Sequence, residues 1–112
     1  MSMTDVDSDF LLAVSAKVRA GDADAFRQLF DALYGPLRRF AWSLVRDEAQ
    51  AEDLVQEAFV RLWDRRGSVD GDIPLRAWLY RTVRNLALNS RRDQATRTRL
   101  LDDPVSRDTP VV

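Results

Sequence analysis

Apolar residues recur at helical spacing along most of the chain, and no stretch of useful length alternates as a strand does. A first helix is predicted with Ser8 or Asp7 as its N-terminal cap, and Gly21 is expected to end it. Its apolar positions are Phe10, Leu11, Val14 and Val18. A second helix begins after Asp22 or Asp24 and is expected to end at Gly35 and Pro36, where the chain can restart and continue to Val45. Its first part is expected to face the core with Phe26, Leu29, Phe30, Leu33 and Tyr34. Its second part is expected to do so with Leu37, Phe40, Ala41, Leu44 and Val45.

After a short break at Arg46 and Asp47, residues 49–66 form a predicted helix whose two faces differ. At about 100° per residue, one face is apolar and reads as core: Leu54, Val55, Ala58, Phe59, Leu62 and Trp63. The other face places acidic and amide side chains around an exposed valine: Asp53, Gln56, Glu57, Val60 and Asp64. A solvated helix side would look similar, because single exposed apolar residues are common. We interpret the face as a docking surface.

Residues 67–74 contain two glycines and a proline and are predicted to form a loop. A last helix starts at Pro74, with Asp72 as its cap, and runs to Arg92. Its buried stripe is Leu75, Leu79, Val83, Leu86 and Ala87. Residues 1–7 are expected to be a disordered leader and residues 93–112 a linker or tail, because apolar periodicity is lost there. The predicted fold is an all-α compact bundle of four to five helices over residues 8–92.

Arginines gather on one arc of the last helix, away from its apolar stripe. The arc comprises Arg81, Arg84, Arg91 and Arg92, with Trp78, Asn85 and Asn89 along its margin and Arg76 in the first turn. Arginine suits phosphate contacts, and asparagine offers a donor and an acceptor to a base edge. The arc therefore indicates a nucleic-acid surface, although a solvated arginine face would show the same pattern.

Composition narrows the possible functions. A chain of 112 residues suits one small domain, and it has no cysteine or histidine, which excludes thiol and imidazole chemistry and the usual zinc sites. No apolar run approaches a membrane span. The net charge of −1 is the sum of a basic segment and an acidic remainder. Residues 76–99 carry seven arginines and one aspartate, and the rest of the chain is acidic. We therefore expect one surface to meet a polyanion and another to meet a basic partner.

Two segments resemble a known family. The run from Ala51 to Phe59, followed by Arg61, Leu62 and Trp63, resembles the signature helix of bacterial RNA polymerase sigma factors of the extracytoplasmic-function group, in their conserved region 2. The segments 77–81 and 84–87 are similar to the family's helix that lies against the minus-ten promoter element. The resemblance covers roughly residues 22–92.

The resemblance implies a non-enzymatic promoter-recognition domain, and neither a cofactor nor a metal is expected. A cytoplasmic location is expected because the sequence has no membrane span and residues 1–9 are acidic and polar. Asp53, Gln56 and Glu57 would contact the clamp helices of the polymerase largest subunit, with Val60 and Trp63 as an apolar centre beside Asp64. The loop would hold a base turned out of the melted, single-stranded minus-ten non-template DNA, through Val69, Asp70, Gly71 and Asp72. Asn85 is the strongest candidate for a base contact. An anti-sigma factor is an expected further partner, and a second, helix-turn-helix domain, typical of the family, is not expected within this sequence.

One alternative remains open, a helical module of sigma ancestry that acts as an anti-sigma decoy and no longer binds DNA. A carboxylate metal site made by Glu52, Asp53 and Glu57 is not expected, because such sites in helical bundles generally also use histidine, which this chain lacks.

Overall fold

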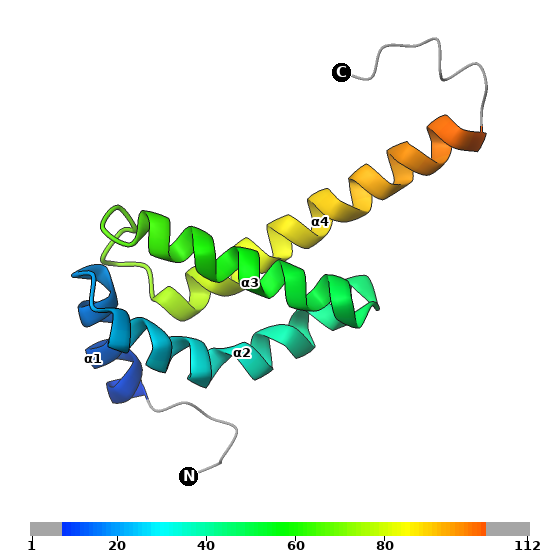
Figure 1. The fold of residues 1–112 in the computed structure, drawn as a ribbon. Coiled ribbons are helices and arrows are strands. Elements are labelled where there is room, and N and C mark those ends of the chain that lie inside the picture. The colour runs from blue at the N-terminus through cyan, green and yellow to red at the C-terminus, as the bar shows by residue number, and fades with distance from the viewer. Residues whose placement is uncertain (1–7, 103–112) are drawn as a thin grey trace.

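Four helices form the part of the chain that the computed structural model describes, which is the backbone of residues 8–102 and the side chains of residues 9–90. They are α1 (Ser8–Arg19), α2 (Ala23–Val45), α3 (Glu48–Arg65) and α4 (Leu75–Asp102). No strand occurs in this part of the chain, which confirms the all-α prediction. α2 packs against each of the other three helices, and α3 also packs against α4 (Figure 1).

The core lies along the apolar stripes predicted for the four helices. The largest fully buried side chains are Val18, Leu29, Leu33, Leu37, Val55, Leu62, Leu75, Leu79 and Val83. Phe10, expected on the inner side of α1, is instead 38% exposed. α1 packs chiefly against α2, so only a narrow stripe of α1 is covered, and Val14 and Val18 fill that stripe.

α2 does not end at Gly35 and Pro36 as predicted. It continues as one helix with Pro36 inside it (Figure 1), so the bundle has four helices over the described residues. A proline in a helix interior costs about 3 kcal/mol, and a glycine about 1 kcal/mol. The buried stripe crosses this pair without interruption, because Leu33 precedes it and Leu37 follows it, both fully buried. Each buried leucine contributes about 1.5–3 kcal/mol, so the stripe as a whole outweighs the cost.

The turn from α1 to α2 is built by a glycine and an aspartate. Gly21 has φ +93°, its N–H donates to the Val18 carbonyl at 2.9 Å, and the Asp22 N–H donates to the Lys17 carbonyl at 3.0 Å. This pair of bonds is a Schellman motif, which requires a left-handed residue at the position of Gly21. The Asp22 carboxylate then accepts from the Ala25 N–H at 3.1 Å and caps α2. The cap predicted at Asp22 or Asp24 is thus at Asp22.

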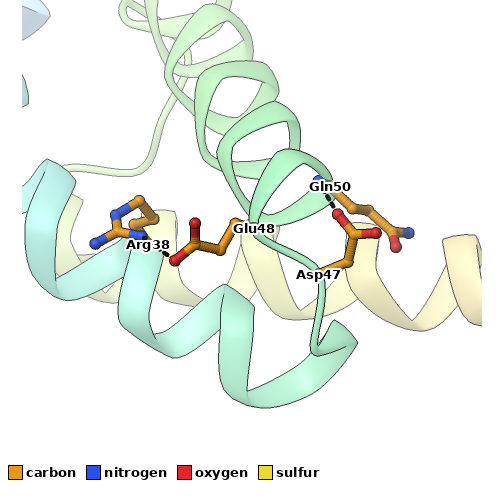
Figure 2. A network of polar contacts seen from close by, with 4 residues as sticks. All are labelled: Arg38, Asp47, Glu48 and Gln50. Carbon is orange, nitrogen blue, oxygen red and sulfur yellow. Dashed lines mark hydrogen bonds and ion pairs between the residues drawn. The ribbon is translucent and has the colours of Figure 1, made fainter.

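The junction of α2 and α3 is equally short and is shown in Figure 2. Arg46 adopts a left-handed conformation, with φ 56°, and ends α2. Asp47 caps α3, since its carboxylate accepts from the Gln50 N–H at 2.8 Å, and Arg38 of α2 forms an ion pair with Glu48 at 3.7 Å. The break predicted at Arg46 and Asp47 is confirmed. The Gln50 amide also donates to the Ser90 hydroxyl and links α3 to α4.

α4 is longer than predicted: it continues past Arg92 and ends at Asp102. Residues 93–102 lack glycine and proline, so fading apolar periodicity did not end the helix. The first proline after Arg92 is Pro104, two positions beyond the last described residue of α4. At the other end, Pro74 precedes the helix and its carbonyl accepts from the Trp78 N–H at 3.0 Å, so Pro74 occupies the cap position that was expected of Asp72. The predicted leader, the cap at Asp7 and the end of the tail lie outside the described residues.

Candidate functional site

The predicted docking face of α3 borders an open groove of about 360 Å³. Seven residues line it: Phe26, Phe30, Gln56, Phe59, Val60, Trp63 and Asp64. Val60 is 54% exposed, and Trp63 is only partly covered by the core. Four of the six predicted docking residues therefore meet around one largely apolar hollow, whose other wall belongs to α2.

Aromatic rings build the floor of this groove. Phe26 packs edge-on against Trp63 at 5.0 Å between ring centroids, and Phe30 lies 4.7 Å from Phe59. Arg66 packs on Trp63, with its guanidinium 4.1 Å from the centroid of the Trp63 ring and a hydrogen bond of 2.6 Å to the Trp63 carbonyl. The rings interlock across two helices, so the groove is preformed rather than assembled on binding.

The remaining two predicted docking residues, Asp53 and Glu57, are exposed and do not line the groove. Glu57 forms an ion pair with Arg61 one helical turn later, at 3.0 Å. An exposed pair of this kind is worth less than about 0.5 kcal/mol, so it can yield to a partner's arginine at little cost. Among the residues that the structure describes, Asp53 has no ion pair, so its carboxylate is the more available of the two.

Five described residues of the predicted basic arc of α4 are exposed, as expected: Arg76, Arg81, Arg84, Asn85 and Asn89. Within the described part of the chain, none of these arginines forms an ion pair with a carboxylate. Arg76 instead lies 5.9 Å from the Tyr80 ring centroid. The side chains of Arg91 and Arg92 lie outside the described residues. Trp78 is partly buried against the core, so it presents less of its ring than the sequence suggested.

The loop between α3 and α4 places its predicted site residues in two environments. Val69 packs against the core, whereas Asp70, Gly71 and Asp72 are exposed. The Ile73 N–H donates to the Asp70 carbonyl at 3.0 Å, and the Asp72 N–H donates to the Asp70 carboxylate at 2.9 Å. These bonds define a tight turn over residues 70–73 with Gly71 and Asp72 at its tip.

Several residues of these surfaces were not predicted. Phe26 and Phe30 were assigned to the core, but they also form the α2 wall of the groove. Leu88 is 43% exposed and lies one helical turn after Arg84, inside the basic arc. The helical wheel of α4 could have indicated Leu88, because this leucine falls off the buried stripe. No single-helix pattern could have indicated the two phenylalanines, which need the packing of α2 on α3.

The model of one protein family, sigma-70 region 2, matches residues 29–97. The chain belongs to this family. The match begins inside α2 and includes α3, the loop and most of α4, so it contains the basic arc, the loop and every residue that lines the groove except Phe26. Sigma factors are transcription initiation factors, and membership of the family confirms that the chain is not an enzyme.

Curated sigma factors are similar to this region 2 chain over most of its length. The ECF RNA polymerase sigma factor SigL of Mycobacterium tuberculosis is 43% identical over 75 residues, which are 65% of this chain and 42% of SigL. The sigma factor CnrH of Cupriavidus metallidurans is 36% identical over 91 residues, 81% of this chain and 44% of CnrH. SigW of Bacillus subtilis, another ECF sigma factor, is 32% identical over 73 residues, 65% of this chain and 39% of SigW.

The chain thus spans about two fifths of the length of the curated relatives it matches. No solved structure matches it significantly. Within the described residues of this region 2 domain, no group of three or more acidic side chains is placed to hold a metal ion, and none of the helices is long and apolar enough to cross a membrane.

Proposed function

We propose that this sigma region 2 domain docks on core RNA polymerase through the groove of α3 and binds the melted minus-ten promoter element through the loop and α4. The groove carries the docking half of this proposal, because it combines an exposed apolar centre at Val60 and Trp63 with the Asp64 carboxylate in its lining. Interfaces concentrate their binding energy at such aromatic centres surrounded by polar residues.

The proposed partner of the groove is the pair of clamp helices in the polymerase largest subunit. Arginines on those helices would meet Asp53, Asp64 and Glu57, and a carboxylate can accept two parallel bonds from one guanidinium. Val60 would enter the apolar contact between them. Because this partner is RNA polymerase, we expect the domain to act in the cytoplasm. An anti-sigma factor would compete for the same groove.

The DNA half of the proposal rests on the exposed arginines of α4. Arg81 and Arg84 have no carboxylate partner within the described residues, so they can pair with phosphates without first breaking an ion pair. Asn85, next to Arg84, can bond a base edge, and the exposed side chain of Leu88 offers an apolar contact to a thymine methyl group or a base face. The tip of the loop, at Gly71 and Asp72, would contact an extruded base.

The test is a binding titration of the chain with bacterial core polymerase, alone and in the presence of a single-stranded non-template minus-ten oligonucleotide. We expect the chain to bind the polymerase and the oligonucleotide to increase its affinity, because the two surfaces lie on different helices and can be occupied together. Binding to an anti-sigma protein without binding to polymerase or DNA would instead identify a decoy of sigma ancestry.

A further inference from the structure

One arginine of α1 fastens the loop between α3 and α4. Arg19, the last residue of α1, directs its Nη2 atom to two carbonyls of the loop, that of Ile73 at 2.6 Å and that of Asp70 at 3.3 Å. A guanidinium nitrogen carries two N–H groups, so it can serve both carbonyls at once. In Figure 1, the end of α1 and this loop lie at the same end of the bundle.

The two carbonyls belong to the first and last residues of the turn at 70–73. The turn has one backbone bond of its own, from the Ile73 N–H to the Asp70 carbonyl at 3.0 Å. Arg19 adds a second connection across the same two residues, and its positive charge strengthens the bonds that it donates. The arginine therefore holds the turn closed and leaves Gly71 and Asp72 at the exposed tip.

The same arginine borders a hollow of about 420 Å³ between α1 and the loop. Leu12 and Ser15 of α1 line one side of it, and Gly71 and Asp72 line the other. Leu12 is 71% exposed, whereas Ser15 is buried. The side chain that bonds the turn is thus also one of the residues that line this hollow.

The Arg19 side chain is not arranged for stability alone. Its Nε atom is buried and has no hydrogen-bond partner among the described residues. An unpaired buried donor offsets part of what the two loop bonds gain.

We propose that Arg19 is a positioning residue for base recognition, which holds the 70–73 turn in the conformation that presents Gly71 and Asp72 to an unpaired base. The inference rests on the proposed function of the loop. It extends the DNA-binding apparatus to α1, which lies outside residues 29–97 matched by the family model. Arg19 itself contacts the loop, not the base.

The first experiment measures amide hydrogen exchange by NMR in the wild-type chain, in Arg19→Met and in Lys17→Met. Lys17 is exposed on the same last turn of α1, so its variant removes an equal charge without touching the loop. In Arg19→Met, exchange of the Asp72 and Ile73 amides should rise by about tenfold, as expected for the loss of a charge-assisted hydrogen bond. Exchange in α3 should stay unchanged. Equal loop exchange in Arg19→Met and the wild type would overturn the inference.

The second experiment measures base discrimination. A single-stranded DNA decamer is selected from a random pool on the wild-type chain, and each nucleotide is replaced in turn by an abasic site. Removing the captured base should weaken wild-type binding by roughly tenfold, since a stacked base contributes about 1–3 kcal/mol. In Arg19→Met this factor should fall to about twofold, while Lys17→Met keeps it and Arg19→Lys, which retains donors, falls between.

The outcomes separate this inference from the function on which it rests. If the wild-type chain shows no base discrimination at any position, the proposed function of the loop fails and the role of Arg19 fails with it. If the wild type discriminates and Arg19→Met discriminates equally, only the role of Arg19 is refuted. Thermal melts of all variants accompany both measurements. Should Arg19→Met be unfolded, Arg19→Lys decides the question, and full discrimination by Arg19→Lys together with unprotected loop amides would refute the inference.

Discussion

Val60 and Leu62 lie two positions apart on α3, and replacing each should damage a different property of the domain. Leu62 is fully buried, whereas Val60 is 54% exposed in the groove. Leu62→Ala should cost about 2–5 kcal/mol in the free energy of unfolding, because it leaves a cavity in the core. For a domain of this size, that loss lowers the melting temperature by roughly 10 °C or more.

Val60→Asp should instead leave the fold nearly unchanged and abolish docking. An exposed substitution usually changes unfolding by less than about 0.5 kcal/mol. In the complex, about half of the side chain of Val60 remains to be buried, which is worth roughly 1 kcal/mol, or about fivefold in affinity. That is the loss expected for Val60→Ala. The aspartate adds the cost of burying an unpaired carboxylate, so its affinity should fall at least about 100-fold.

Thermal melts and polymerase titrations of the three variants test this assignment. Ala13→Asp is the matched control, because it places the same carboxylate on the exposed side of α1. We expect Ala13→Asp to bind polymerase as the wild type does. If Val60→Asp bound polymerase normally, or if it melted the domain as Leu62→Ala does, the groove would not be the docking surface.

Three further predictions concern the turns and α4. Gly21→Ala should lower the free energy of unfolding by about 1–2 kcal/mol in a denaturant titration, because φ +93° is unfavourable for any residue with a Cβ atom. Asp47→Ala should cost about 1 kcal/mol in the same assay through loss of the α3 cap. Arg84→Ala should weaken binding to all single-stranded sequences and flatten its salt dependence, whereas Asn85→Ala should mainly relax base preference, as measured by fluorescence anisotropy on a set of oligonucleotides.

Each of these predictions has an outcome that contradicts it. Unchanged stability in Gly21→Ala would show that the α1–α2 turn has another available conformation. Asp22→Ala removes the equivalent cap of α2, so a large difference between it and Asp47→Ala would mean that capping is not what is measured. Equal loss of base preference in Arg84→Ala and Asn85→Ala would show that their roles are wrongly divided.

A helix boundary or a buried helix face can be predicted from the sequence where residues of that helix alone determine it. Gly21 ends α1 and Asp22 caps α2, and both roles are typical of these residue types. The apolar stripe of α3 can be predicted from a helical wheel alone. Pro36 shows the limit of that reasoning, because a local signal for a break is overruled by burial of Leu33 and Leu37 on both sides of it. α4 shows the opposite case. Apolar periodicity is lost after Arg92, yet the helix continues to Asp102 through a segment without glycine or proline.

The site is harder to predict than the fold, because its parts come from different helices. A wheel identifies Gln56, Val60 and Asp64 as one exposed face, but it cannot show that Phe26 and Phe30 of α2 turn that face into a groove. Glu57 is different, because its ion pair with Arg61 has i, i+4 spacing and can be predicted from the sequence. Whether these residues bind polymerase stays a prediction for the titration above.

Arg19 is the clearest case of a residue that no local pattern could reveal. In the sequence it is one basic residue at the end of a helix, where a favourable interaction with the helix dipole already accounts for its presence. Its contacts join positions more than 50 residues apart, since its partners are the carbonyls of Asp70 and Ile73. Every residue has a backbone carbonyl, so the sequence of the loop does not indicate that Arg19 binds it. A cation that bonds main-chain atoms across the fold is therefore found only from the packed structure, and here it connects α1 to the loop proposed to receive the base.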